Sequence, residues 1–257
     1  MNERLKTQYS HWLKEEAQAF AGWDFSYLDG RWQFEALPWA YKDWVKTYLS
    51  PALKLLDMGT GGGEILLGFN HPHKNTTVTE AYPPNIALIQ KFLAPLGISV
   101  VPVKQDDLLP IADNVFDIVI NRHESFDADE VFRVLKPGGV FITQQVGGQN
   151  NRVLSEFLIE DFKPPYPDWD ATHAAKKLAL SGFEVLEKKE AFPNLTFLDT
   201  GAVVYFAKII AWEFPGFSVK ACFEPLEAIE RTIQETGHFV SKEHRFLLVA
   251  KKPDTKK

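Results

Sequence analysis

Cysteine and long apolar runs are scarce in this chain of 257 residues. The single cysteine, Cys222, excludes an internal disulfide and a zinc site built from several thiolates. The longest apolar stretch, Gly201 to Trp212, contains Lys208 and is far shorter than the roughly 20 residues that a membrane-spanning helix needs. The N-terminus is charged and lacks the apolar core of a signal peptide. These absences predict a soluble, cytoplasmic protein in a reducing compartment.

An excess of basic residues is also missing. Lys and Arg number 28 against 34 Asp and Glu, which gives a net charge of -6. Proteins that bind many phosphates usually carry positive charge, so this balance disfavours nucleic acid as a partner. We also expect no association with a membrane. The composition is that of a globular protein, with 45% hydrophobic and 24% charged residues, which excludes a largely disordered chain. It carries no indication of the oligomeric state.

From residue 53 onward, short apolar or β-branched segments alternate with helical ones. Strands are expected at residues 53–58, 76–80, 98–103, 116–120, 139–144, 183–189 and 245–251. Strands that alternate with helices favour right-handed βαβ units and a mostly parallel sheet covered on both faces. The pattern therefore predicts an α/β protein with a doubly wound sheet.

Two segments depart from this rhythm. Residues 1–52 are rich in aromatic side chains and show helical spacing, whereas residues 192–222 are long, aromatic and interrupted by two prolines. We predict an N-terminal helical cap over residues 1–52. The domain that carries the sheet should then span residues 53–257, with an inserted helical cap segment at about 192–222.

The most informative stretch is the turn after the first strand, Asp57-Met58-Gly59-Thr60-Gly61-Gly62-Gly63-Glu64. Glycines let the backbone approach a ligand closely, and the helix that follows supplies N–H donors. The dinucleotide fingerprint G-x-G-x-x-G fails here, because its third glycine would fall on Glu64 or Leu66. A P-loop is excluded because no Gly-Lys pair follows. Glu64 at the helix start would also repel a pyrophosphate, which disfavours a nicotinamide-dependent oxidoreductase.

The run Asp57-x-Gly59-x-Gly61-x-Gly63 instead resembles the cofactor motif of class I S-adenosylmethionine-dependent methyltransferases. Within this superfamily it is similar to methyltransferases of type 11. Other family features follow in the same order: Glu80 at the end of the second strand, Gln105-Asp106-Asp107 after the third, Leu109-Pro110 ahead of the fourth, and Leu135–Gly139 before the fifth. The resemblance covers residues 53–146 closely, and the strand pattern extends it to about 250. It implies a seven-stranded, Rossmann-like methyltransferase fold with an antiparallel last strand and a helical, aromatic-rich cap.

The resemblance also implies a cofactor, S-adenosyl-L-methionine, and the residues that would bind it. The carboxylate of Glu80 would accept hydrogen bonds from the ribose hydroxyls, and either Asp106 or Asp107 would meet the adenine amino group. The expected cofactor-binding residues are Asp57, Gly59, Thr60, Gly61, Gly63, Glu80, Ala81, Asp106, Asp107 and Asn121. No metal site is expected, because His71 and His73 have no acidic partner nearby.

Methyl transfer is an in-line displacement at a carbon already activated by a sulfonium, so the protein has mainly to orient the reactants and exclude water. In an open α/β sheet the ligand lies beyond the carboxyl ends of the strands. The fourth strand ends there at Asn121–Ser125, where His123 would act as general base on a hydroxyl or amine. Glu124 would orient it or act itself, and Arg122 would bind an anionic substrate group. The structural alternatives are a helix-capping turn and a surface ion pair.

We therefore expect an enzyme that transfers a methyl group from S-adenosylmethionine to a small molecule, at oxygen or nitrogen. In relatives, segments outside the core cover the substrate, and the aromatic residues of these segments favour an apolar or aromatic acceptor. An RNA or protein methyltransferase is one alternative. It is disfavoured by the acidic charge and, for nucleic-acid amino groups, by the absence of an Asp/Asn-Pro-Pro-aromatic run at residues 121–124. A non-catalytic S-adenosylmethionine-binding protein is the alternative of a different class.

Overall fold

The structure is a computed structural model that describes residues 3–20, 24–104 and 108–254. The chain divides into two compact units, and each is assembled from separate stretches of sequence. The first unit comprises Met1–Leu37, Gly148–Asp168 and Ala191–His244, and the second comprises Pro38–Gly147, Trp169–Glu190 and Arg245–Lys257. In the described part of the chain, no helix is long and apolar enough to cross a membrane.

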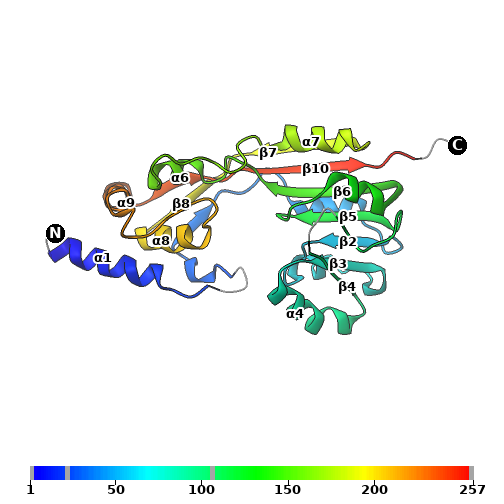
Figure 1. Ribbon diagram of the computed structural model, residues 1–257, viewed down its shortest axis with the longest axis horizontal. Helices are drawn as coiled ribbons and strands as arrows, with labels where there is room; N and C mark the ends of the chain where they lie inside the picture. Colours follow the sequence, from blue (N-terminus) through cyan, green and yellow to red (C-terminus); the bar gives the residue numbers. More distant parts are fainter. Residues whose placement is uncertain (1–2, 21–23, 105–107, 255–257) are drawn as a thin grey trace. The chain divides into compact units, whose positions relative to one another are not determined.

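The second unit is built on a seven-stranded sheet with the order β4-β3-β2-β5-β6-β10-β7 (Figure 1). Its strands are β2 (Leu55–Met58), β3 (Thr76–Glu80), β4 (Ser99–Pro102), β5 (Phe116–Arg122), β6 (Leu135–Val146), β7 (Glu184–Ala191) and β10 (Arg245–Lys251). The pairs β2–β3, β3–β4, β2–β5 and β5–β6 are parallel, whereas β10 runs antiparallel to β6. The predicted α/β class, with a mostly parallel sheet and an antiparallel last strand, is confirmed.

Helices cover both faces of this sheet. They are α2 (Tyr41–Tyr48), α3 (Glu64–Leu67), α4 (Pro83–Phe92), α5 (Ala128–Val134) and α7 (Ala171–Leu180), with 3-10 turns at His73–Asn75 and Ala94–Leu96. Side chains alternate along each strand, so neighbouring residues serve opposite faces. Leu56 and Val119 pack in the cluster that includes α5 and α7, while Leu55 and Ile118 pack in the cluster that includes α2 and α4. The sheet is therefore doubly wound, as predicted.

The order of the strands places a switch point between β2 and β5. From β2 the chain proceeds outward through β3 and β4, then returns to β5 on the other side of β2. The loops that leave the carboxyl ends of β2 and β5 diverge there and leave room for a ligand. In the register of this pair, Met58 lies beside Asn121, so the glycine turn and the His123 loop start from adjacent strand ends.

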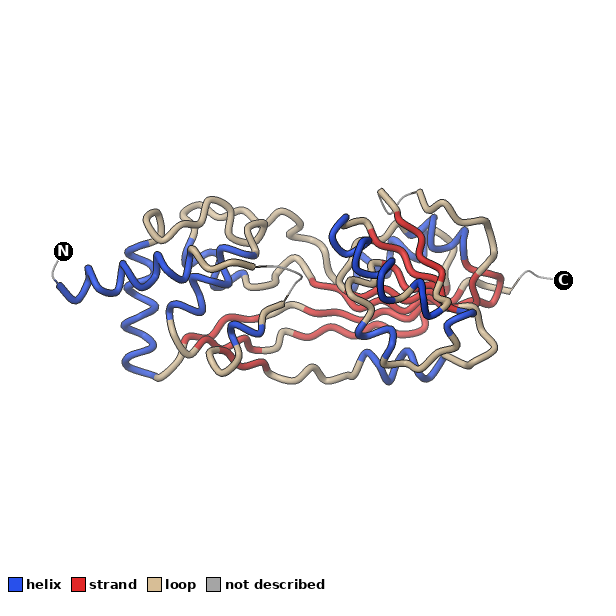
Figure 2. Tube along the Cα trace, turned by 90° about the horizontal axis from the view of Figure 1, so that it is seen from below, coloured by secondary structure: helices blue, strands red, loops and turns tan. Residues whose placement is uncertain are grey.

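The first unit has a small antiparallel sheet of its own, in the order β1-β8-β9. It consists of β1 (Trp32–Phe34), β8 (Asn194–Phe197), β9 (Phe239–Lys242), and the helices α1 (Glu3–Glu16), α6 (Arg152–Leu158), α8 (Thr200–Ile209) and α9 (Phe223–Thr236), with a 3-10 turn at Ser26–Leu28. Figure 2 shows the chain trace with helices in blue and strands in red. Its aromatic core includes Trp12, Phe197 and Phe214. The cap is thus aromatic-rich, but it is not wholly helical.

The strand β8 corrects the expectation of a purely helical segment at residues 192–222. Asn194–Phe197 pairs with β1 on one side and with β9 on the other. Both partners lie far away in the sequence, and pairing of this kind leaves little trace in local composition. The expectation holds for α8, which is buried over most of its length.

The two units also divide the chain differently from the expected boundary at residue 52. Helix α2, which composition alone assigns to the cap, buries Tyr41 and Val45 in the cluster that covers the large sheet. Residues 148–168 and 223–244 belong to the first unit instead of the second. The apolar face of a helix shows that the helix packs against a core. It does not show which of the two cores that is.

Candidate functional site

The glycine turn joins β2 to α3 at the carboxyl edge of the large sheet. Gly59, Gly61 and Gly63 have φ values of +66°, +61° and +86°, a conformation that glycine adopts without the steric cost of a Cβ. A Cβ on Gly63 would lie 2.8 Å from Leu93 Cδ1, whereas a Cβ on Gly61 would meet no atom within 4 Å. Gly61 therefore borders open space, where a ligand can approach the backbone.

Backbone hydrogen bonds hold this turn against the end of β3. The N–H groups of Gly59 and Thr60 both donate to the carbonyl of Thr79, at 3.1 and 3.2 Å. The N–H of Gly63 donates to the carbonyl of Thr60 at 3.0 Å. The turn is fixed before any ligand binds, so little conformational entropy remains to be lost there on binding.

Glu80 connects the glycine turn with the start of α4. Its buried carboxylate accepts hydrogen bonds at Oε2 from Gly61 N (2.9 Å) and Asn85 Nδ2 (3.4 Å). Its Oε1 accepts from Ala81 N and Tyr82 N, both at 2.9 Å. Each carboxylate oxygen already accepts two bonds. A ribose hydroxyl that reached Glu80 would therefore share an oxygen with Gly61 or Asn85.

Asp57 is buried at the same edge of the sheet. Burial raises the pKa of this carboxyl to about 7, and the charge of Glu80 adds to the rise. The proton occupancy of Asp57 thus changes close to neutral pH. A cation bound nearby would favour the charged carboxylate and would lower this pKa again.

Glu124 reaches the glycine turn from the loop that follows β5. A Cβ on Gly59 would collide with Cβ and Cγ of Glu124. Gly59 is therefore required as glycine for a second reason, since it lets the Glu124 side chain pack directly over the turn. Together with Asp57 and Glu80, Glu124 makes the surroundings of the turn acidic.

Asn121, at the end of β5, is fully buried and engaged with its own strand neighbours. Its Oδ1 accepts hydrogen bonds from Thr143 Oγ1 (2.9 Å) and Gln145 Nε2 (2.5 Å), and its Nδ2 donates to the Ser125 carbonyl (3.4 Å). These bonds use both ends of the amide and join the carboxyl ends of β5 and β6. Direct contact between Asn121 and a cofactor stays a prediction.

His123 follows in a left-handed backbone conformation, with φ of +64°. Its backbone N–H donates to the Gln144 carbonyl at 2.8 Å, and its ring Nε2 lies 3.2 Å from Gln144 Nε2. Surrounding protein atoms, followed by the charges of Arg122 and Arg245, lower the pKa of His123 well below its ordinary value. The side chain is nevertheless exposed, so a substrate can reach it.

The structure thus brings Asp57, the glycine turn, Glu80 and Glu124 together, with His123 on the adjacent strand end. Asp106 and Asp107, which were predicted to meet adenine, lie outside the described residues. Gln144 and Gln145, at the end of β6, are not among the site residues expected from the sequence. A polar pair that closes an otherwise apolar strand is a signal for such residues, because buried amides need partners.

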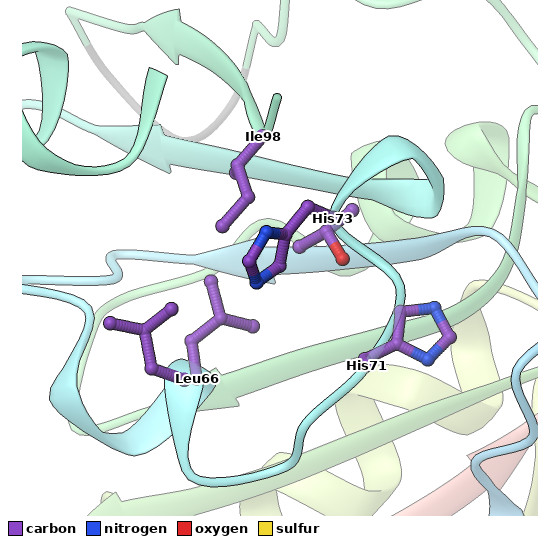
Figure 3. A pocket seen from close by; sticks show the side chains of 6 residues that line it. Leu66, His71, His73 and Ile98 are labelled. Carbon is purple, nitrogen blue, oxygen red and sulfur yellow. The ribbon is translucent and has the colours of Figure 1, made fainter. Parts of the chain in front are cut away.

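A small cavity lies at the other end of β3 and is separate from this site. It is lined by Leu66, Leu67, His71, His73, Thr76 and Ile98, and four of these are labelled in Figure 3. Its volume of about 10 Å³ is close to the minimum for one water molecule. His71 and His73 bond to the carbonyls of Leu53 and Leu96, at 3.0 and 3.2 Å. Within the described residues, no group of three or more His, Cys, Asp or Glu is placed to hold a metal ion.

Comparison with known proteins finds a family match over part of the chain and several similar structures. Residues 56–143 match the family described as a methyltransferase domain. A candidate methyltransferase from Bacillus halodurans C-125 has a similar structure, with a TM-score of 0.55 at 16% identity over 83% of this chain and 98% of its own. The [4+2]-cyclase SpnF gives 0.50 at 19% identity, over 83% and 80%. No curated protein matches the sequence.

Another similar structure extends over both units. It is a protein of unknown function from Deinococcus radiodurans R1, with a TM-score of 0.56 at 13% identity over 98% of this chain and 100% of its own. The family match and the sheet order agree with the resemblance drawn from the sequence: residues 56–143 match a methyltransferase domain and lie in a sheet with the strand order β4-β3-β2-β5-β6-β10-β7. The matching domain is that of methyltransferases, and the methyl donor of this fold family is S-adenosyl-L-methionine.

The described residues suit this cofactor. S-adenosylmethionine carries an ammonium and a sulfonium against a single carboxylate, so it is a net cation. The acidic surroundings formed by Asp57, Glu80 and Glu124 attract a cation and repel a pyrophosphate. The open space beside Gly61 allows a nucleoside to approach the backbone.

Proposed function

We propose that this protein transfers the methyl group of S-adenosylmethionine to an oxygen or nitrogen atom of a small molecule. The observation that supports this most directly is the acidic glycine turn, with Gly61 open to a ligand, at the switch point between β2 and β5. When bound, the cofactor supplies an activated methyl group. The residues of this chain then have to hold the reactants in line and keep water away.

The roles of the binding residues follow from their positions. Asp57 and Glu124 would face the cationic amino-acid end of the cofactor, and the turn from Gly59 to Gly63 would lie along its nucleoside. Glu80, with Ala81 beside it, would meet the ribose hydroxyls. Asp106 or Asp107 would meet the adenine, and Asn121 would contact the cofactor at the end of β5.

The abundance of aromatic residues in segments 1–52 and 192–222 favours an apolar or aromatic acceptor. The test is turnover with a cofactor labelled in its methyl group, using metabolite, RNA and protein fractions of a cell extract as acceptors. The proposal predicts label in a small molecule. Label confined to RNA or protein would contradict the small-molecule acceptor, and cofactor binding without transfer to any fraction would indicate a non-catalytic protein.

The affinity for S-adenosylmethionine is expected to rise as the pH increases through about 7, because Asp57 then carries the charge that attracts a cation. The folded pKa lies above the ordinary value near 4. In the protein without cofactor, the contribution of Asp57 to the free energy of unfolding is therefore fully present below about pH 4. It is lost as the pH rises through about 7, because the buried carboxyl resists losing its proton. Calorimetry in two buffers with different heats of ionisation should detect release of a proton on binding near pH 7.

The Asp57→Asn variant provides the control for this measurement. It cannot ionise, so it should bind the cofactor without that proton release, and its stability relative to the parent should improve between pH 4 and pH 7. Proton release that persists unchanged in Asp57→Asn would show that another group is responsible.

Whether His123 or Glu124 removes a proton from the acceptor stays a prediction. If His123 is the base, His123→Ala should lower the rate of transfer by about 10²–10⁴-fold with cofactor affinity nearly unchanged. A variant that keeps most of its rate would leave Glu124 as the residue to test, with Glu124→Gln. The ring of His123 has its Nε2 atom 3.2 Å from Gln144 Nε2, and a nitrogen engaged in this way is not free to take a proton from the acceptor.

A further inference from the structure

One face of the large sheet ends in polar residues at its carboxyl edge. Arg122 of β5 pairs in register with Gln144 of β6, and Arg245 of β10 pairs with Val146, two residues further along β6. Because side chains alternate along a strand, Arg122, Gln144 and Arg245 all belong to the face that carries Ile120. Two guanidinium groups and a buried amide thus share one end of this face.

The orientation of the Gln144 amide is set by Trp39. Trp39 Nε1 donates to Gln144 Oε1 at 2.9 Å, and an indole nitrogen can only donate. The amide oxygen must therefore face Trp39, and the NH2 group must face His123 Nε2, 3.2 Å away. A reversed amide would set two donors against each other. Gln144 is 4% exposed, so water cannot readily replace either bond.

This arrangement fixes the proton of the His123 ring. Since Gln144 Nε2 has no lone pair, it donates, and His123 Nε2 must accept. The ring proton of the neutral imidazole then resides on Nδ1, for which no hydrogen-bond partner is found among the described residues. A second proton on Nε2 would clash with the Gln144 NH2 group and would add charge beside Arg122 and Arg245. His123 is therefore held as a neutral donor, which is a poor general base.

Gln144 also fixes the backbone of His123. A left-handed φ of +64° is costly for a residue with a Cβ, and the 2.8 Å bond from His123 N to the Gln144 carbonyl maintains it. One residue of β6 thus sets both the backbone and the ring of His123. Arg122, beside it, is exposed and has no ion-pair partner in the part of the chain that the structure describes.

We propose that the methyl acceptor is an oxyanion, a carboxylate or phenolate on an apolar or aromatic body, bound by Arg122 and Arg245 and by the Nδ1–H of His123. This rests on the proposed methyltransferase function and names its substrate class. Guanidinium groups are suited to carboxylates and phenolates. A neutral imidazole N–H orients the oxygen without protonating it, which keeps its lone pairs available. Gln144 and Trp39 are positioning residues in this account.

The reaction then needs no base. The acceptor oxygen forms a bond to the methyl carbon, the carbon–sulfur bond breaks, and its electron pair stays on sulfur. The negative charge of the oxygen and the positive charge of the sulfonium are both consumed, and no proton moves. Two positive guanidinium groups lower the energy of the anion in the site, but they also raise its local concentration and fix its direction of approach.

The experiment uses the full-length protein labelled with ¹⁵N in histidine, without cofactor, and benzoate as the probe. The His123 signals, assigned with the His123→Asn variant, should show a proton on Nδ1 and a neutral ring down to mildly acidic pH. Benzoate should shift these signals in a saturable way, and uncharged benzamide should bind at least about tenfold more weakly. Arg122→Gln should weaken benzoate about tenfold, whereas Arg231→Gln, on the exposed side of α9, should not.

Three results would overturn the proposal: a proton on Nε2, equal binding of benzoate and benzamide, or unchanged benzoate binding in Arg122→Gln. Calorimetry with S-adenosylmethionine separates this proposal from the proposed function. A parent protein that binds benzoate as described but does not bind S-adenosylmethionine would contradict methyl transfer and would still support the anion site. A parent that binds S-adenosylmethionine but shows no preference for benzoate would contradict only the anion site.

Discussion

Gly61→Val is expected to abolish measurable binding of S-adenosylmethionine, with an affinity loss of about 100-fold or more, equivalent to about 2.7 kcal/mol. Gly61 has a φ of +61°, and a Cβ there would meet no protein atom within 4 Å. A valine side chain would therefore occupy the space that the nucleoside needs, and its branched Cβ would also disfavour the left-handed backbone. Calorimetry on the folded variant measures the loss.

Gly97→Val is the matched control for this variant. Gly97 also has a positive φ, +93°, and a Cβ there would likewise meet no atom within 4 Å, but it lies before β4, away from the glycine turn. The backbone strain should be similar in the two variants, so a difference in cofactor affinity reports on the space beside Gly61. Equal affinity in Gly61→Val and in the parent would remove the glycine turn from the binding site.

Glu80→Gln is expected to weaken S-adenosylmethionine binding by about tenfold to a hundredfold, the range for a hydrogen bond to a charged group. Both oxygens of Glu80 accept backbone N–H groups, from Gly61 on one side and from Ala81 and Tyr82 on the other. A glutamine keeps one oxygen, and its NH2 group must then face a backbone donor. The near-isosteric change should therefore disturb both the glycine turn and the ribose contact, and Glu80→Ala should lose binding as well.

Glu64→Gln separates this effect from a simple loss of charge near the turn. The Glu64 carboxylate lies against Gly62, where it would collide with an added Cβ, but its side chain is exposed. Removing its charge should change cofactor affinity much less than Glu80→Gln does. If the two variants bind alike, the charge of the turn matters and the hydrogen bonds of Glu80 do not.

The regular part of the fold was predictable from local sequence. Thr76–Glu80 and Arg245–Lys251 form strands with the expected bounds, and helices such as α7 (Ala171–Leu180) alternate with the strands. These segments have a clear period, and their ends carry glycine, proline or a capping aspartate such as Asp170. The glycine turn was predictable for a related reason, because only a few backbone conformations and ligands require that many glycines in so short a stretch.

Side-chain partnerships across strands were not predictable in the same way. The pairing of Gln144 with Trp39 and His123 joins three segments that are far apart in the sequence. A hypothesis of general base catalysis follows naturally from a histidine at a strand end. The tautomer of His123, however, depends on an amide whose orientation only the three-dimensional arrangement determines. The strand β8 could not be predicted for the same reason, because its partners β1 and β9 are far away in the sequence.

A crystal structure of the protein grown with S-adenosylmethionine would show directly whether the cofactor binds at the glycine turn. We expect electron density for the nucleoside beside Gly61, with the ribose hydroxyls within hydrogen-bond distance of Glu80. The amino-acid end should lie near Asp57 and Glu124, and the methyl group should face the loop that carries His123. Cofactor density at any other place, or a glycine turn that remains empty at saturating S-adenosylmethionine, would contradict this expectation.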